Sequence, residues 1–202
     1  MAKLLLATQN PGKITEFRRL LGKMPGLELV IPLDLGLNLD VEETGSTYGE
    51  TAALKAMAFA AVSGLPALGD DSGLEIAALG GEPGLHSARI APTAAERRAL
   101  VLAWLAGKPR PWKASFHSTL CLAIPSGENP PDGEQYFAEG VCLGQISPEE
   151  RGAGGFGYDP IFLIEGDTRT MAELPPEVKD RLSHRGRAVE EMGQILAMVL
   201  RL

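Results

Sequence analysis

An apolar run that turns directly into a helical pattern near the N-terminus constrains this chain most. Residues 3–7 have the pattern of a short buried strand, 10–12 are Asn-Pro-Gly, and apolar residues recur at helical spacing over 14–21. Such a turn directs backbone N–H groups and the positive end of the helix outward, which suits phosphate. Lys13 adds a cation where a helix dipole disfavours one. The segment indicates either a phosphate-binding loop or an ordinary connection with a surface lysine.

This turn lacks the residues of a Walker P-loop. That motif would need glycine where Ala7 stands and Ser or Thr where Ile14 stands. Any phosphate bound here is therefore held by a loop of another kind.

Length and charge limit the classes of protein that this chain can represent. With 202 residues, it predicts a single domain over 1–202 that has two lobes. A formal net charge of −7 argues against nonspecific binding to nucleic acid or an anionic membrane, and no apolar stretch is long enough to span one. Cys121 and Cys142 stand alone and predict small buried side chains in a reducing compartment. We therefore expect a cytoplasmic protein.

Strand and helix patterns alternate along the chain, which predicts an α/β fold with a mixed sheet flanked by helices. The Pro- and Gly-rich stretch 125–133 is expected to be a hairpin loop between two long strands. The expected strands are 3–7, 27–31, 65–69, 74–79, 114–124, 135–146 and 161–164, and the expected helices are 14–21, 48–62, 93–105, 177–182 and 187–200.

Carboxylates gather near the third predicted strand and the second predicted helix. Asp70 and Asp71 follow a strand, so their side chains must alternate and one should point into a ligand crevice. A crevice carboxylate together with a glutamate from another segment would suit Mg²⁺, which takes few carboxylates plus phosphate oxygens and water. Glu42, Glu43 and Glu50 are the glutamates available; Glu42 is expected rather to complement the N-terminus of the predicted helix, and Glu50 fits either role.

Residues 152–157 match G-x-G-x-x-G, but the flanking residues do not predict the strand-before, helix-after context of a dinucleotide fold. Phe156 and Tyr158 lie among these glycines and either stack on a nucleobase or pack within a turn. Further along, Lys179 and Ser183 lie one helical turn apart, and His184-Arg185 offers donors to a keto oxygen or phosphate. Taken alone, His184 fits a structural role as well.

These motifs together resemble the Ham1/RdgB family of inosine triphosphate pyrophosphatases, which act on non-canonical purine nucleoside triphosphates. They occur in family order along nearly the whole chain. The matching segments are Thr8-Gln9-Asn10-Pro11-Gly12-Lys13, Glu42-Glu43-Thr44-Gly45, Asp70-Asp71-Ser72-Gly73-Leu74, Gly80-Gly81-Glu82-Pro83-Gly84, residues 154–160 and Ser183-His184-Arg185-Gly186.

The resemblance implies a fold and a reaction. The fold would be an elongated α/β structure with a central mixed sheet and a cleft between two lobes, usually a homodimer. The reaction would convert ITP, dITP or XTP into the monophosphate and pyrophosphate, by Mg²⁺-assisted attack of water on the α-phosphorus. This activity would keep deaminated purines out of nucleic acid.

The resemblance also implies roles for individual residues. Asp71 would be the catalytic base and, with Glu43, a Mg²⁺ ligand. The base pocket would be Phe156, Gly157, Tyr158 and Asp159, and His184-Arg185 would read the 6-keto oxygen. Ser72 would contact substrate, and the triphosphate would be held by Thr8, Gln9, Asn10, Pro11, Gly12, Lys13, Lys55 and Lys179. Gln9 departs from the glycine usual in the family.

Two other functions remain open from the sequence. A regulator that binds purine nucleotides without hydrolysing them would use the same residues. An NAD-dependent oxidoreductase would need a strand, a turn and a helix within 147–161.

Overall fold

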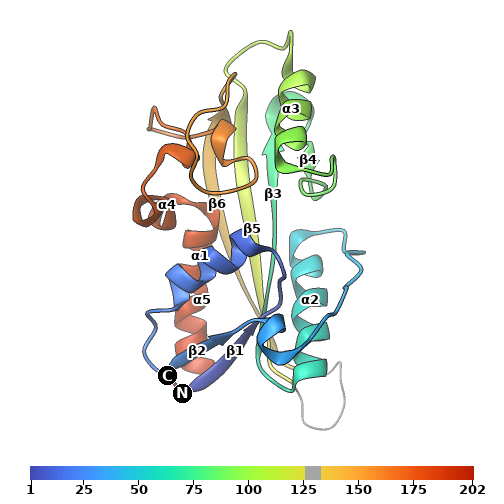
Figure 1. Ribbon diagram of the computed structural model, residues 1–202, viewed down its shortest axis with the longest axis vertical. Coiled ribbons are helices and arrows are strands. Elements are labelled where there is room, and N and C mark those ends of the chain that lie inside the picture. The colour runs from blue at the N-terminus through green and yellow to red at the C-terminus, as the bar shows by residue number, and fades with distance from the viewer. Residues whose placement is uncertain (126–132) are drawn as a thin grey trace. The chain divides into compact units, whose positions relative to one another are not determined.

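A computed structural model describes residues 1–125 and 133–202 (Figure 1). The strands form one sheet in the order β2-β1-β3-β5-β6-β7, and β4 pairs with β3. Because β1 runs parallel to β2 and β3 while β6 and β7 are antiparallel, the sheet is mixed, as expected. The strands are β1 (Ala2–Leu6), β2 (Leu27–Val30), β3 (Ala67–Ile76), β4 (Pro83–Gly84), β5 (Lys113–Ala123), β6 (Gln135–Ile146) and β7 (Phe162–Ile164).

The α-helices confirm the predicted set, with bounds that differ by a few residues. They are α1 (Pro11–Leu21), α2 (Tyr48–Ser63), α3 (Ala94–Leu105), α4 (Pro176–Leu182) and α5 (His184–Val199), and short 3₁₀ turns cover Pro32–Leu35, Ala77–Leu79, Asp159–Ile161 and Met171–Glu173. The predicted capping box of α3 is present, since Thr93 and Glu96 satisfy each other's backbone N–H groups. Of the predicted hairpin loop, 126–132 lie outside the described residues.

The chain divides into two compact units. Unit 1 contains Met1–Asp71, Ser118–Glu139 and Arg187–Leu202, and unit 2 contains Ser72–His117 and Gly140–Gly186. The strands β3, β5 and β6 and the helix α5 contribute residues to both units. The boundary in β3 falls between the neighbouring residues Asp71 and Ser72.

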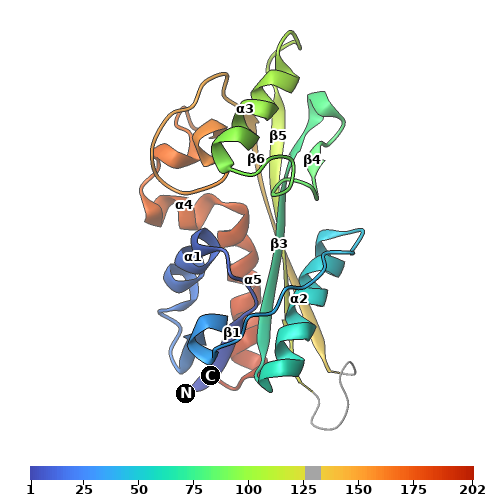
Figure 2. The ribbon, with the colours of Figure 1, turned by 45° about the vertical axis from the view of Figure 1, so that its right-hand side comes forward.

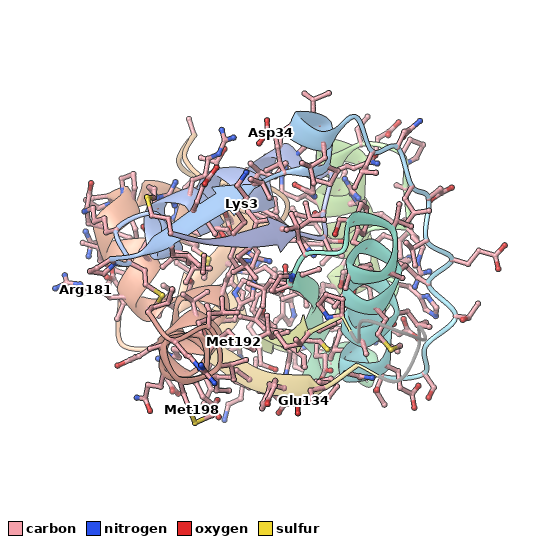
Figure 3. The ribbon with its side chains drawn as sticks, turned by 90° about the horizontal axis from the view of Figure 1, so that it is seen from below. Lys3, Asp34, Glu134, Arg181, Met192 and Met198 are labelled. Atoms are coloured by element: carbon pink, nitrogen blue, oxygen red, sulfur yellow. The ribbon has the colours of Figure 1, made fainter. Side chains whose placement is uncertain are left out.

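In unit 1, helices cover both faces of the sheet (Figures 1 and 2). Leu4 and Leu6 of β1 pack with α1 and α5 on one face, whereas Leu5 packs with the alanine-rich side of α2 on the other. The terminal helix α5 turns Met192 inward, fully buried, and leaves Met198 68% exposed (Figure 3). The alternation along β1 thus explains why an almost continuous apolar run forms this strand.

Unit 2 has its own apolar core. Leu74 and Ile76 of β3 and Phe116 of β5 pack with Val101 and Leu105 of α3. The two cysteines are buried, as expected, Cys121 in unit 1 and Cys142 in unit 2. Among residues 1–125 and 133–202, no helix has the length and apolar character needed to cross a membrane.

The strand β3 differs from its prediction. Two short strands at 65–69 and 74–79 were expected, but one strand runs from Ala67 to Ile76 through the polar sequence between them, and Ala77–Leu79 is a 3₁₀ turn. Local propensity disfavours Gly and Asp in strands, but pairing with neighbouring strands overrides it here. The carboxylates of Asp70 and Asp71 are therefore set by strand geometry, on alternate faces.

Candidate functional site

The turn after β1 is held by its own side chains. Asn10 is the N-cap of α1, and its Oδ1 accepts from Gly12 N at 2.9 Å and Lys13 N at 3.2 Å. The Asn10 N–H donates to Thr8 Oγ1 at 3.2 Å, and Pro11 occupies the first helical position. These two helix amides were expected to point outward toward a ligand. They instead donate to Asn10, because an Asx cap can satisfy them locally.

The ammonium group of Lys13 contacts Asp70 in β3. Its Nζ lies 3.0 Å from Asp70 Oδ2 and donates to Asp70 O at 3.1 Å. Ser118 Oγ donates to Asp70 Oδ1 at 2.7 Å, and the Asp70 side chain is 1% exposed. Leu6 pairs in parallel with Leu68, and this explains the proximity, because the residues that follow Leu6 and Leu68 then lie at the same end of the pair. Asp70 thus holds the lysine of the predicted phosphate loop, which the sequence reasoning did not foresee.

Lys55 of α2 lies between two carboxylates. Its Nζ is 2.5 Å from Glu43 Oε1 and 2.8 Å from Asp71 Oδ1, and the side chains of Lys55 and Asp71 are 14% and 10% exposed. Burial raises the pKa of Asp71, and the positive charges of Lys55 and Lys13 offset this only in part. Burial lowers the pKa of Lys55, but attraction to Asp71 and Glu43 outweighs it, so the net pKa is raised. The pKa of Asp71 is thus raised from its usual value, the direction that makes a carboxylate a better proton acceptor.

Gly69 allows α2 to approach this part of β3. A Cβ at Gly69 would lie 2.1 Å from the carbonyl oxygen of Ala52 and 3.0 Å from Ala56 N. Lys55 lies between these two residues in α2. The close approach of helix and strand therefore brings the Lys55 ammonium within reach of Asp71, two residues after Gly69.

In unit 2, two cations lie near the ring of Phe156. Lys179 Nζ is 5.2 Å and Arg185 Cζ is 5.6 Å from the ring centroid. Lys179 forms an ion pair with Asp159, and both side chains are about 95% buried. Asp159 Oδ2 also accepts from Phe156 N at 2.7 Å. The predicted base-pocket residues Phe156 and Asp159 are thus brought together with Lys179 and Arg185.

The glycine-rich segment is explained by this arrangement. Gly155 has φ +69°, and a Cβ there would lie 1.9 Å from Asp159 Oδ2 and 3.0 Å from Lys179 Nζ. No α-helix occurs in the described segment 147–161, which follows β6 and ends with the 3₁₀ turn Asp159–Ile161. The strand–turn–helix that an NAD-binding function requires is absent from these residues.

The other unit 2 candidates are divided between the site and the core. Arg185 Nη2 lies 3.1 Å from Ser72 Oγ, and its side chain is buried. The His184 ring stacks on Phe116 with centroids 4.6 Å apart and planes 12° apart. Tyr158 is 6% exposed, packs in the core cluster and donates its hydroxyl to Ser87 O at 2.6 Å. The structure thus gives Tyr158 and His184 packing roles, and their contact with substrate stays a prediction.

Several acidic and amide side chains have local roles. Glu50 accepts from Ser46 N at 2.7 Å and from Ser46 Oγ at 2.6 Å, so it has the capping role considered from the sequence. Gln9 is exposed, and its Nε2 lies 3.4 Å from Asn38 Oδ1, so its side chain makes a long contact with the loop that contains Asn38.

Gly157 O accepts from Arg98 Nη1 at 2.8 Å, a contact that no local sequence signal marked.

Comparison with known proteins places the chain among relatives of similar length. The model of the Ham1 family matches residues 4–195. A protein of Methylococcus capsulatus named dITP/XTP pyrophosphatase is 45% identical over 197 residues, covering 96% of each chain, and one of that name from Coxiella burnetii is 43% identical over 205 residues, covering 97% of each.

Solved structures agree with this relationship. The structure of a HAM1 protein from Coxiella burnetii has a TM-score of 0.84 at 40% identity and covers 98% of this chain and 100% of its own. That of the Staphylococcus aureus Ham1 protein has a TM-score of 0.81 at 34% identity and covers 98% of this chain and 99% of its own. The chain therefore belongs to the Ham1 family.

Proposed function

We propose that the protein hydrolyses the non-canonical purine nucleoside triphosphates dITP, XTP and ITP to the monophosphate and pyrophosphate. Its relatives named dITP/XTP pyrophosphatase, matched over nearly their full length, support the substrate class. The observation that carries the proposal for this chain is the Lys55 ammonium between Glu43 and Asp71 of β3. Carboxylates from two separate segments thus lie next to one ammonium group.

The residues of unit 1 would act on the triphosphate. Lys13 and Lys55 would neutralise the charge on phosphate oxygens, and the Thr8–Gly12 turn would position the backbone that contacts these oxygens. Asp71 would orient a water molecule toward the α-phosphorus and take its proton, for which burial provides a raised pKa. Positioning and charge neutralisation would then supply most of the rate acceleration.

The same carboxylate pair fits Mg²⁺. Within the described residues, no group of three or more His, Cys, Asp or Glu side chains is arranged to hold a metal. Mg²⁺ needs fewer protein ligands, because substrate phosphates and water complete its six oxygen ligands. Glu43 and Asp71 already place one oxygen each within 2.8 Å of the Lys55 cation. The ion would supply charge neutralisation of the triphosphate and the departing pyrophosphate.

The residues of unit 2 would select the base. The Phe156 ring would stack on the purine, and the Arg185 guanidinium, which only donates, would bond a 6-keto oxygen. The 6-amino group of ATP cannot accept that bond, so buried donors would lose a partner. His184, Ser72, Gly157, Tyr158, Asp159 and Lys179 would complete this side of the site.

We further propose that the protein works in the cytoplasm as a homodimer. The family resemblance supports the homodimer, and the buried cysteines Cys121 and Cys142 are compatible with a reducing compartment.

Product analysis tests the proposed function. The purified protein is incubated with Mg²⁺ and XTP, dITP, ITP or ATP, and nucleotides and pyrophosphate are separated by ion-exchange chromatography. We expect monophosphate and pyrophosphate in equal amounts from the first three, and little product from ATP. Asp71→Asn should retain the circular dichroism spectrum and lose turnover. Binding without products would favour the regulator instead, and diphosphate with phosphate would identify a different hydrolase.

A further inference from the structure

A long-range contact fixes the turn that carries Phe156. Arg98, on α3, donates from Nη1 to Gly157 O at 2.8 Å. Its Nε also lies 2.9 Å from Glu150 Oε1, and its side chain is only 15% exposed. The two ends of this contact are 59 residues apart in the sequence but belong to the same unit. Arg98 therefore connects α3 to residues 150–157 at two points, Glu150 and Gly157.

The acceptor of this bond is the central peptide group of a tight turn. Asp159 N donates to Phe156 O at 3.2 Å, which closes a four-residue turn. Gly157 has φ +63° and Tyr158 has φ −96° and ψ 3°, the signs of a type II′ turn. Rotation of the central peptide group would convert this turn into another type. A guanidinium bonded to the Gly157 carbonyl oxygen favours one orientation over the other.

The turn in question orients the groups expected to meet the purine. Phe156 opens it, with its ring near Lys179 and Arg185, and its N–H donates to Asp159 Oδ2. A change in the central peptide group would rotate the backbone on which both Phe156 and Asp159 depend. Arg98 bonds the turn at the Gly157 carbonyl oxygen, so its influence on Phe156 and Asp159 passes through that group.

We propose that Arg98 is a positioning residue for base selectivity, acting through the Phe156–Asp159 turn. This inference rests on the proposed function, because it assumes that Phe156 and Arg185 meet the purine. Glu150 supports it by holding the guanidinium from its other side. The chain thereby ties recognition of the base to a helix far from it in sequence.

The test compares Arg98→Met with a matched control. Arg151→Met also removes an arginine that donates to a carbonyl, Thr168 O at 2.8 Å, and lies 3.7 Å from a carboxylate, Glu173, within the same unit. Its acceptor lies outside the Phe156–Asp159 turn. Two quantities are measured: the ratio of kcat/KM for ITP to that for ATP, and hydrogen–deuterium exchange of the Phe156 amide by NMR.

We expect Arg98→Met to lower the selectivity ratio about tenfold, the size typical of losing one charge-assisted hydrogen bond. The loss should come through a higher KM for ITP with kcat little changed, and the Phe156 amide should exchange faster. Arg98→Lys, which keeps the charge and one donor, should recover part of both effects. Arg151→Met should leave both quantities at the wild-type values, and Glu150→Gln should change them less than Arg98→Met.

An unchanged selectivity ratio in Arg98→Met would overturn the inference, whether or not the amide exchanges faster. Equal effects of Arg98→Met and Arg151→Met would also overturn it, because they would show a general loss of stability. If Arg98→Met does not fold, Arg98→Lys and Glu150→Gln are judged by the same two quantities. A wild-type protein that hydrolyses none of the nucleotides would refute the proposed function and the selectivity role together, whereas the amide exchange still reports separately on whether Arg98 holds the turn.

Discussion

The buried ion pair between Asp159 and Lys179 gives a sharp prediction for the stability of unit 2. The substitution Asp159→Asn removes the negative charge but keeps the side-chain shape and an amide oxygen for the Phe156 N–H. The Asp159 and Lys179 side chains are 4% and 5% exposed, so the ammonium would lose its counter-ion in a nearly dry environment. Breaking a buried pair at one partner costs about 3–5 kcal/mol.

One contact reduces the expected loss. Lys179 Nζ lies 5.2 Å from the Phe156 ring, and a desolvated cation–π contact retains roughly 1–2 kcal/mol of stabilisation. We therefore expect the lower end of the range, about 3 kcal/mol, which corresponds to a fall in Tm of roughly 6–12 °C for a chain of this size. In the double variant Asp159→Asn/Lys179→Met, most of the stability should return, because the buried charge is gone.

Urea unfolding followed by tryptophan fluorescence measures this loss. Both tryptophans of the chain, Trp104 and Trp112, lie in unit 2, so the signal reports on the unit that contains the pair. Asp167→Asn is the matched control, because Asp167 pairs in the same unit with Arg169, and their side chains are 20% and 48% exposed. Its effect should be a small fraction of that of Asp159→Asn. Equal effects of the two substitutions, or a double variant less stable than Asp159→Asn, would refute the reasoning.

Three further predictions concern candidate residues of unit 1 and of unit 2. In Lys55→Met, the acid limb of the pH profile of kcat/KM should move to higher pH. The positive charge of Lys55 lowers the pKa of Asp71, so its loss lets burial raise that pKa further. An acid limb that stays in place or moves to lower pH would contradict the assignment of Asp71 as the base. Gly69→Ala should destabilise the protein by about 2 kcal/mol or more in urea unfolding, since its Cβ would lie 2.1 Å from Ala52 O. Wild-type stability would show that α2 can move away from β3 at little cost in free energy. Arg185→Ala should narrow the ratio of kcat/KM for ITP to ATP, and a ratio that stays constant would move base recognition to other residues.

Local signals in the sequence predicted much of the fold. The Thr93–Glu96 capping box marked the start of α3, and the strand expected over 135–146 has the same bounds as β6. The continuity of β3 was missed because Gly69 to Gly73 is a poor strand former by itself. On either side of this stretch, β3 pairs with β1 at residues 67–68 and with β4 at residues 74–75, and β5 is its other neighbour in the sheet; such pairing leaves no local signal.

The candidate site was predictable as a set of residues but not as a set of contacts. The alternation of Asp70 and Asp71 followed from strand geometry. Their partners Lys13, Ser118 and Lys55 lie 57, 48 and 16 residues away, and only the tertiary fold determines them. The Asn10 cap was accessible from the sequence, since Asn before Pro at a helix start commonly binds the first free amides.

Hydrolysis in water enriched in oxygen-18 tests most directly whether water attacks the α-phosphorus. The purified protein is incubated with XTP and Mg²⁺ in labelled water, and the products are analysed by mass spectrometry. We expect one labelled oxygen in the xanthosine monophosphate and none in the pyrophosphate. Label in the pyrophosphate with unlabelled monophosphate would place the attack at the β-phosphorus and contradict the role assigned to Asp71.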